Sequence, residues 1–360
     1  NMKILIASSQ PFLPEIMGGM QKSSDILARM LHDKGHDCQL LTALIGSGWF
    51  GWMARMKLKL SGGPIVRDSG LGYPVGRAWF PWQCVERLAC KEKPDVIIIP
   101  CGKPVQMALE ARKAGIPVVM WLQNVEFTDH GGNFADLGYI PCVANSSFTA
   151  MKYHTAYGVD PVVIHPMIDG RRYRTDTTRE NVAFINPHPL KGLDVAVKVA
   201  EKCPDIPFSF IQTWTSSEAE QKELKRKISG LSNVTLCPPV SDMRKVYQKA
   251  RIVLAPSQWE EAYGRIATEA QYSGIPVVAS NRGGLPEAVG RGGVLLDPDG
   301  DIHHWVDAVQ KLWHDPLHYQ SLSDFAFAHA NRPELDIGWQ LEKWENLLYD
   351  ITGKPVERHA

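Results

Sequence analysis

The sequence predicts an α/β protein built from two doubly wound, Rossmann-like domains. Short continuous apolar runs rich in Val and Ile alternate with helical patterns along its 360 residues, and such runs are typical of parallel strands that are buried on both faces. The segment Ala-Gly-Ile-Pro-Val-Val at 114–119 returns as Ser-Gly-Ile-Pro-Val-Val at 273–278. The two copies lie about one domain length apart, and a chain of this length holds about two domains.

The predicted strands form two sets, one in each half of the chain. Strands of the first set occupy 3–9, 38–43, 95–100 and 116–122. Strands of the second set occupy 181–187, 208–212, 233–239, 251–256 and 275–280. The first helix is predicted over Ser23–Lys34, because its apolar residues share one face and Gly35 can adopt the left-handed conformation that ends helices.

The domain boundary is predicted at 165–180, a polar and charged segment without a strand pattern. We expect a first domain over 1–168 and a second domain over 169–337. The last segment, 338–360, is amphipathic at its start. We expect it to form a helix that crosses back to the first domain.

Charge and cysteine content exclude several classes of protein. Lys plus Arg and Asp plus Glu both number 39, so no overall charge draws the chain to nucleic acid or to a membrane. No apolar run reaches the ~18–20 residues that span a bilayer, and the start lacks the basic flank of a signal peptide. The seven cysteines are odd in number and have no metal-ligand spacing. We therefore expect a cytoplasmic protein with no disulfide frame and no metal site.

The segment 255–287 carries the most informative pattern of polar residues. A strand ends before a loop that contains Glu261, Gly264 permits a tight turn, and a helix starts near Arg265 with Glu269 one turn further on. Free backbone N–H groups at a helix start, approached through a glycine, can bind phosphate. Carboxylates before and within such a site can accept hydrogen bonds from sugar hydroxyls.

This segment closely resembles the E-x7-E donor-site motif of family-4 glycosyltransferases with the GT-B fold. Segment 2–31 resembles the first strand, glycine-rich loop and first helix of that family, 143–169 its domain junction, and 236–257 its base-binding loop. The resemblance implies two Rossmann-like domains facing across a cleft, with the acceptor on the first and a nucleotide-sugar on the second. It implies sugar transfer with retention of anomeric configuration, a donor that is most often a UDP-sugar, and no metal or other cofactor. The acceptor, which could be a sugar, a lipid-linked or a small molecule, is left open.

Carried over to this sequence, the resemblance assigns Glu261 to the donor sugar and Glu269 to the ribose hydroxyls. Backbone amides around Tyr263, Gly264 and Arg265 would bind the sugar and the diphosphate. Without a metal, the leaving diphosphate must be stabilised by cations and a helix dipole.

Two further segments are assigned to donor binding by the same resemblance. Gly18 and Gly19 end the first strand-to-helix loop, where glycine allows a backbone to approach a ligand closely, and would border the diphosphate and the acceptor. The nucleotide base would lie near Val240 and Met243. The glycines do not form G-x-G-x-x-G, so they do not indicate a dinucleotide cofactor.

The phosphate-binding residues depart from the family pattern. Lys191 is present and would hold the phosphates as a point charge, but Asn186 stands where the family has Arg. Arg265 stands where the family more often has an apolar residue. We hypothesise that Arg265 supplies the missing cation; the alternative is that it pairs with a neighbouring acid.

A second departure follows the strand at 116–122. Gln123 stands where the family commonly has a His that contacts the donor sugar and the reaction centre. Gln can still hydrogen-bond a hydroxyl but cannot carry charge. His130, in a glycine-rich loop, could swing into the site instead, or could be a solvated loop residue.

The stretch 49–60 combines an aromatic face with basic residues. It contains Trp49, Phe50, Trp52, Met53 and Met56 beside Arg55, Lys57 and Lys59. Such a face can sit at an anionic lipid surface, which would fit a lipid-linked acceptor and a peripheral position at the membrane. The alternative is an ordinary helix with its apolar stripe on the sheet and its lysines in water.

Three classes of function are compatible with these features. The first is a retaining glycosyltransferase, the second a nucleotide-sugar-binding protein that has lost activity through the changes at Asn186 and Gln123. The third is another two-lobed enzyme such as a sugar-nucleotide epimerase or a phosphorylase. The order of the motif in 255–287 favours the transferase.

Overall fold

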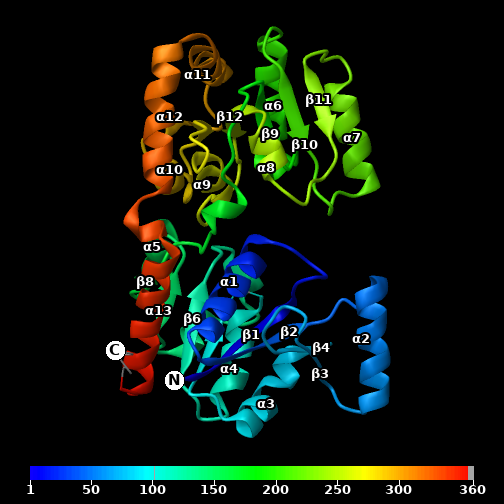
Figure 1. Cartoon of the computed structure of the whole chain (residues 1–360), viewed down its shortest axis with the longest axis vertical. Helices are drawn as coiled ribbons and strands as arrows, with labels where there is room; N and C mark the ends of the chain where they lie inside the picture. The colour runs from blue at the N-terminus through cyan, green and yellow to red at the C-terminus, as the bar shows by residue number, and fades with distance from the viewer. Residues whose placement is uncertain (101, 356–360) are drawn as a thin grey trace. The chain divides into compact units, whose positions relative to one another are not determined.

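Each half of the chain forms its own sheet in the computed structural model, which describes residues 1–100 and 102–355 (Figure 1). Unit 1 comprises Asn1–Ile168 and the chain from Glu334 on, whereas unit 2 comprises Asp169–Pro333. The chain therefore leaves unit 1, builds unit 2 and returns. Cys101 and residues 356–360, the end of the predicted C-terminal segment, lie outside the described residues.

Unit 1 contains an eight-stranded sheet in the order β3-β4-β2-β1-β5-β6-β7-β8. All neighbouring strands are parallel except β3 and β4, which are antiparallel. The strands are β1 (Lys3–Pro11), β2 (Asp37–Ala43), β3 (Val66–Asp68), β4 (Val75–Ala78), β5 (Val96–Ile99), β6 (Val118–Leu122), β7 (Cys142–Ala144) and β8 (Val162–Val163). The helices are α1 (Gly19–Asp33), α2 (Gly48–Ser61), α3 (Val85–Glu92), α4 (Pro104–Arg112), α5 (Ser147–Tyr157) and α13 (Ile337–Thr352).

Unit 2 contains a six-stranded parallel sheet in the order β11-β10-β9-β12-β13-β14. The strands are β9 (Asn181–Ile185), β10 (Phe208–Ile211), β11 (Val234–Cys237), β12 (Ala250–Ala255), β13 (Val277–Ser280) and β14 (Gly293–Leu296). The helices are α6 (Leu193–Lys202), α7 (Glu218–Ile228), α8 (Arg244–Tyr247), α9 (Arg265–Gln271), α10 (Leu285–Val289), α11 (Ile302–His314) and α12 (Pro316–Ala330).

The predicted α/β class with two Rossmann-like sheets is confirmed. Every predicted strand overlaps an observed one, whereas β3, β4, β7, β8 and β14 were not predicted. These missed strands have two to four residues each, and in β3 and β4 charged residues interrupt the apolar pattern. The first helix begins at Gly19, earlier than predicted, because the Gln21 side chain accepts a hydrogen bond from the Gly18 amide at 3.1 Å and closes the helix start.

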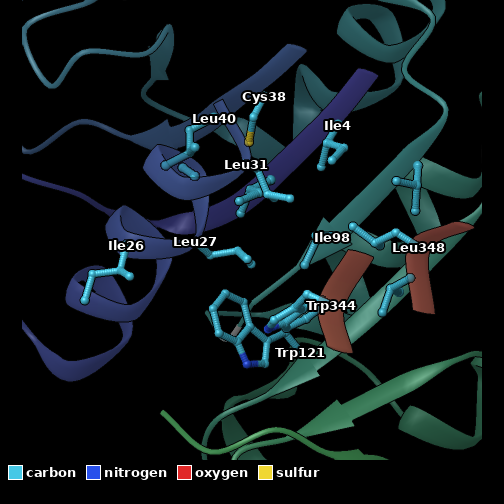
Figure 2. Close-up of a cluster of buried hydrophobic side chains, with 14 of the residues drawn as sticks. Ile4, Ile26, Leu27, Leu31, Cys38, Leu40, Ile98, Trp121, Trp344 and Leu348 are labelled. Carbon is cyan, nitrogen blue, oxygen red and sulfur yellow. The ribbon is translucent and has the colours of Figure 1, made fainter. Parts of the chain in front are cut away.

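The returning helix α13 completes the core of unit 1. Trp344 of α13 is fully buried and meets Trp121 of β6 edge to face, with ring centroids 4.9 Å apart. Figure 2 shows Leu348 of α13 beside the same cluster, with Leu27 and Leu31 of α1 nearby. Burial of these large side chains, each worth about 2–3 kcal/mol, holds α13 on unit 1, as the fold class predicts.

Candidate active site

The carboxyl ends of β9 and β12 lie side by side in unit 2 and carry most of the predicted donor-site residues. These two strands pair in parallel at the centre of the sheet, and ligands of such sheets bind beyond the carboxyl ends of the strands. The short 3-10 helix η5 (Pro189–Lys191) follows β9 and ends at Lys191. The loop after β12 carries Ser257, Trp259 and Glu261.

A close backbone approach fixes these two loops against each other. Gly192 has φ +90°, and a Cβ at this position would lie 2.0 Å from the carbonyl oxygen of Pro256. The amide of Gln258 donates a hydrogen bond to the carbonyl of Leu190 at 2.9 Å. Because any side chain at 192 would force the loops apart, only glycine can place Lys191 beside the β12 loop.

Lys191 and Glu261 form an ion pair at this edge. The Nζ of Lys191 lies 2.6 Å from the Oε1 of Glu261, and the hydroxyl of Ser257 donates to the same oxygen at 2.7 Å. The ammonium of Lys191 also lies 4.9 Å from the ring centroid of Trp259, within the range of a cation–π contact. The two charged side chains are 20% and 18% exposed, so the pair borders solvent.

The pKa of Glu261 lies below its ordinary value. Burial alone would raise this pKa, but the charge of Lys191 and the hydrogen bonds from Lys191 and Ser257 outweigh the burial. Glu261 is therefore ionised at neutral pH and can only accept hydrogen bonds. A sugar hydroxyl is a suitable donor to it.

Glu269 lies in a second network, away from solvent. Its carboxylate is only 4% exposed. The Nε of Arg265 donates to Oε1 at 3.1 Å, and the hydroxyl of Tyr247 donates to Oε2 at 3.0 Å. Of the two readings left open for Arg265, the structure shows the contact with a neighbouring acid, and that acid is Glu269.

The charge of Glu269 raises the pKa values of both of its partners. Burial would lower the pKa of Arg265, but the charge of Glu269 and contacts with Tyr173 and Glu269 outweigh it and hold this pKa above its ordinary value. Burial, reinforced by the Glu269 charge, raises the pKa of Tyr247 well above its ordinary value. Arg265 thus remains a cation and Tyr247 a neutral hydrogen-bond donor at neutral pH.

The turn before α9 is held by its backbone. Gly264 has φ +98°, in the left-handed region, and precedes the first residue of α9, Arg265. The side chain of Tyr263 is buried, and its hydroxyl lies 2.7 Å from Oγ1 of Thr268. The side chain of Tyr263 is therefore engaged within unit 2, which leaves the peptide groups of Tyr263 and Gly264 as the candidates for a ligand contact.

The remaining predicted residues of unit 2 lie in the loops after β9 and β11. Asn186 follows β9 with φ +60°, a left-handed conformation that Asn adopts more readily than most other residues. Its amide donates to the carbonyl of Ile211 at 3.0 Å. Val240 and Met243 are partly exposed in the loop between β11 and α8.

In unit 1, Gly18 and Gly19 stand at the start of α1. The amide of Gly18 donates its hydrogen bond to the Gln21 side chain, and Gly19 is the first helical residue. A Cβ at Gly18 would lie 2.7 Å from the Oε1 of Gln21. Glycine at 18 thus serves the helix start itself.

Gln123 directly follows β6, and its side-chain amide nitrogen is buried without a hydrogen-bond partner in the described part of the chain. Its backbone carbonyl accepts from Asn145 at 3.3 Å. An unpaired buried N–H costs free energy, so a ligand oxygen at this place would be stabilised.

His130 is neither solvated nor free to swing. It is 1% exposed, its Nε2 lies 2.8 Å from the hydroxyl of Tyr153, and its ring packs on Tyr153, Phe127 and Phe134. Burial lowers the pKa of His130. Tyr153 in turn donates to the carbonyl of Asn124 at 3.1 Å, so His130 supports the loop next to Gln123 through Tyr153.

Four residues of the site were not predicted: Ser257, Trp259, Tyr247 and Tyr173. Ser257 and Trp259 lie within four residues of Glu261 in the sequence, so their position beside it could have been inferred. Tyr247 and Tyr173 reach Glu269 and Arg265 from distant segments. No local pattern in the sequence indicates that contact.

Metal-ligating side chains do not gather in the described residues: no group of three or more His, Cys, Asp or Glu there could hold a metal ion.

Within residues 1–100 and 102–355, no helix combines the length and the apolar character needed to cross a bilayer.

Comparison with known proteins gives a family match for the segment that carries this sheet edge. Residues 181–315 match the family described as Glycosyl transferases group 1. This stretch of unit 2 contains Lys191, Glu261, Arg265 and Glu269.

A curated relative is similar to part of the chain. The D-inositol 3-phosphate glycosyltransferase of Paenarthrobacter aurescens (strain TC1) is 33% identical over 203 residues, which cover 52% of this chain and 44% of the relative. The chain thus spans about half the length of the curated relatives that it matches.

Solved structures show the same fold over nearly the whole chain. Anabaena Alr3699/HepE in complex with UDP-glucose gives a TM-score of 0.77 at 20% identity and covers 97% of this chain and 100% of that one. A glycosyltransferase from Rickettsia africae ESF-5 gives a TM-score of 0.74 at 14% identity and covers 99% and 100%. The chain has the fold of these structures, two Rossmann-like domains of the GT-B class.

Proposed function

We propose that this protein is a retaining, metal-independent glycosyltransferase that moves a sugar from a UDP-sugar to a hydroxyl of an acceptor. The observation that carries the proposal is the Lys191–Glu261 pair at the carboxyl edge of β9 and β12, inside the segment that matches the glycosyl transferases group 1 family. Such a pair offers one cation for a diphosphate and one carboxylate for sugar hydroxyls.

The ion pair would supply the cation for a charged donor in a site that holds no metal. The donor diphosphate would compete with Glu261 for the ammonium of Lys191. Glu261 would then be free to accept hydrogen bonds from the sugar, while Ser257 still donates to it at 2.7 Å. Departure of the diphosphate would be stabilised by the fixed charge of Lys191, because a preorganised cation needs no solvent rearrangement.

The ribose would be held by Glu269. Its two oxygens accept one hydrogen bond each, from Arg265 and Tyr247, whereas a carboxylate can accept about four. Each oxygen therefore has a further acceptor position for a ribose hydroxyl, which would be reached by a shift of the Arg265 side chain. The peptide groups of Tyr263 and Gly264 would border the diphosphate, and Val240 and Met243 the base.

The choice of substrates rests on the similar proteins. The HepE structure contains UDP-glucose, which favours UDP as the carrier. The curated relatives are named as D-inositol 3-phosphate glycosyltransferases, so inositol phosphate is the first acceptor to test. In unit 1, Gln123, whose side-chain amide nitrogen is buried without a partner in the described part of the chain, would contact the donor sugar. Gly18 and Gly19 would border the diphosphate and the acceptor. Residues 49–60 would make a peripheral membrane contact.

A second function is favoured by one observation. Asn186 replaces a cation of the family pattern and sits in a left-handed backbone conformation, so one diphosphate contact is missing from this loop. A protein that binds the nucleotide-sugar but transfers it slowly or not at all would fit the same site.

Thermal-shift measurements with UDP, GDP, ADP and TDP and their sugar conjugates test the proposal. Ligand at about 100 Kd stabilises the protein by about 2.7 kcal/mol, which is readily detected. We expect a shift with UDP compounds that persists in a metal chelator and is lost in Lys191→Ala, with Lys222→Ala on α7 as the matched control. Slow donor hydrolysis, and a product whose anomeric configuration by NMR matches that of the donor, would establish retaining transfer. Binding without turnover would favour the second function, and no shift with any nucleotide would overturn both.

A further inference from the structure

Helix α2 presents apolar side chains on two opposite sides. It lies at the periphery of unit 1, beyond β3 and β4 (Figure 1). The inner side packs against unit 1 through Phe50, Gly51, Ala54 and Leu58. The outer face, which faces solvent, consists of Trp49, Trp52, Met53, Met56 and Leu60.

The outer face is a continuous stripe. At ~100° per residue, its five positions fall within an arc of about 100°, roughly opposite the inner side. Trp49 and Leu60 are 76% and 83% exposed. The rings of Trp49 and Trp52 stack with centroids 5.2 Å apart. A helix on the surface of a globular protein normally carries polar residues on its outer side, and a clustered apolar surface indicates an interaction site.

Basic side chains border the outer face on both sides. Arg55 and Lys59 lie along one border and Lys57 along the other, by the same helical spacing, and all three are exposed. Helix α2 contains no Asp or Glu. The helix therefore carries only positive charges, on long stems that can lie beside apolar groups while the charge stays in a polar environment.

We infer that the outer face of α2 docks on an anionic lipid surface. Its Trp, Met and Leu side chains would enter the boundary between headgroups and acyl chains, and its basic residues would contact the anionic headgroups. A second copy of the chain is a poorer partner, because two α2 helices face to face would bring only like charges together. The docking rests on α2 itself; its consequence, a lipid-linked or membrane-borne acceptor, rests on the proposed function.

Sedimentation with vesicles tests the docking on the full chain. Vesicles of phosphatidylcholine alone are compared with equal parts of phosphatidylcholine and phosphatidylglycerol. We expect binding to the anionic vesicles that is lost in Trp49→Ser/Trp52→Ser. Binding should be about 30-fold weaker in Lys57→Gln/Lys59→Gln, at about fivefold per removed charge. Because these side chains are exposed, the variants should fold normally, and unchanged thermal midpoints would show it.

Matched controls come from unit 2. Trp214 is 76% exposed, as Trp49 is, so Trp214→Ser removes a tryptophan of equal exposure. Lys222→Gln/Lys225→Gln removes two exposed charges from α7. Equal losses in the α2 variants and these controls, or no vesicle binding by the unaltered protein, would overturn the inference. A dimer in light scattering that Trp49→Ser/Trp52→Ser abolishes, without vesicle binding, would overturn it in favour of a second copy. Donor hydrolysis in vesicle-free buffer, measured in parallel, reports on the proposed function independently.

Discussion

The ammonium of Lys191 and the carboxylate of Glu261 form an ion pair of 2.6 Å that joins the loops after β9 and β12. In the proposed function, these two groups bind the diphosphate and the donor sugar. A donor then enters by exchanging partners: phosphate replaces Glu261 on Lys191, and sugar hydroxyls replace Lys191 on Glu261. Before the donor arrives, each charge of the pair compensates the other. Substitutions of Lys191 and Glu261 can therefore change stability and activity by different amounts.

Replacement of Lys191 by Ala should reduce both stability and activity. Glu261 would be left as a largely buried carboxylate without its cation, at a cost of about 1–3 kcal/mol in the free energy of unfolding. Loss of the preorganised charge should lower kcat/KM for the UDP-sugar by about 10²–10³-fold. Denaturant unfolding and initial-rate kinetics measure the two effects.

The double variant Lys191→Ala/Glu261→Gln separates the effect on stability from the effect on activity. It removes the uncompensated charge, so the free energy of unfolding should recover most of the loss. Activity should stay as low as in the single variant or fall further. Recovered activity in the double variant would contradict the role of Lys191 in binding the diphosphate.

The stability supplied by the ion pair should depend on pH in the acid range. The pKa of Glu261 is lowered in the folded state, because the Lys191 contacts outweigh burial. A depressed folded pKa gives a contribution that is fully present above the unfolded pKa of about 4.3 and is lost as pH falls through the folded pKa. In Lys191→Ala, burial without the cation raises the pKa of Glu261. The difference in unfolding free energy between the unaltered protein and this variant should therefore be largest at neutral pH. It should shrink as pH falls, first through the raised pKa of the variant and then through the lowered pKa of the unaltered protein. A difference that stays constant down to the lowest pH would show that Glu261 is not the group that Lys191 stabilises.

Arg265→Leu should weaken binding of uridine and of UDP by the same factor. The guanidinium is engaged with Glu269 at 3.1 Å, so its removal should disturb the ribose carboxylate and leave the phosphates unaffected. Lys191→Ala, in contrast, should weaken UDP much more than uridine. Calorimetric titration of both ligands with both variants provides the comparison. A loss for Arg265→Leu that is confined to UDP, and an activity as low as that of Lys191→Ala, would instead support Arg265 as the replacement for the cation absent at Asn186.

The sequence was sufficient to predict the sheets but not the partners within the site. The long buried strands, such as β1 and β9, are continuous apolar runs that are visible in any window. The edge strand β8 has two residues and one exposed position, so it owes its pairing to β7 and not to local pattern. Element type thus follows from local pattern where a strand lies in a continuous apolar run, and from tertiary pairing in a strand as short as β8.

The candidate site divides in the same way. The order of the motifs predicted Lys191, Glu261 and Glu269 as site residues. Their contacts depend on two features that the motifs do not show: the close approach of Gly192 to Pro256, and the hydrogen bond from Tyr247 to Glu269. His130 illustrates the limit most clearly. Its glycine-rich loop suggested solvent exposure, whereas the distant Tyr153 buries it.

Gln123 and His130 should respond differently to substitution. Gln123→Ala removes the amide whose nitrogen is buried without a partner among the described residues. It should lower kcat/KM by about 10–100-fold, which corresponds to the loss of a hydrogen bond of about 1.5–3 kcal/mol to a ligand.

His130→Phe keeps the aromatic packing with Phe127 and Phe134 and loses only the contact with Tyr153. We expect it to change kcat/KM by less than about threefold while lowering the thermal midpoint. Because burial lowers the pKa of His130, the unaltered protein should also lose stability as pH falls below about 6.5, where the unfolded imidazole gains a proton first. His130→Phe should lack that loss. A large drop in kcat/KM for His130→Phe together with a normal value for Gln123→Ala would reverse the assignment and show that the imidazole, not the amide, serves the reaction centre.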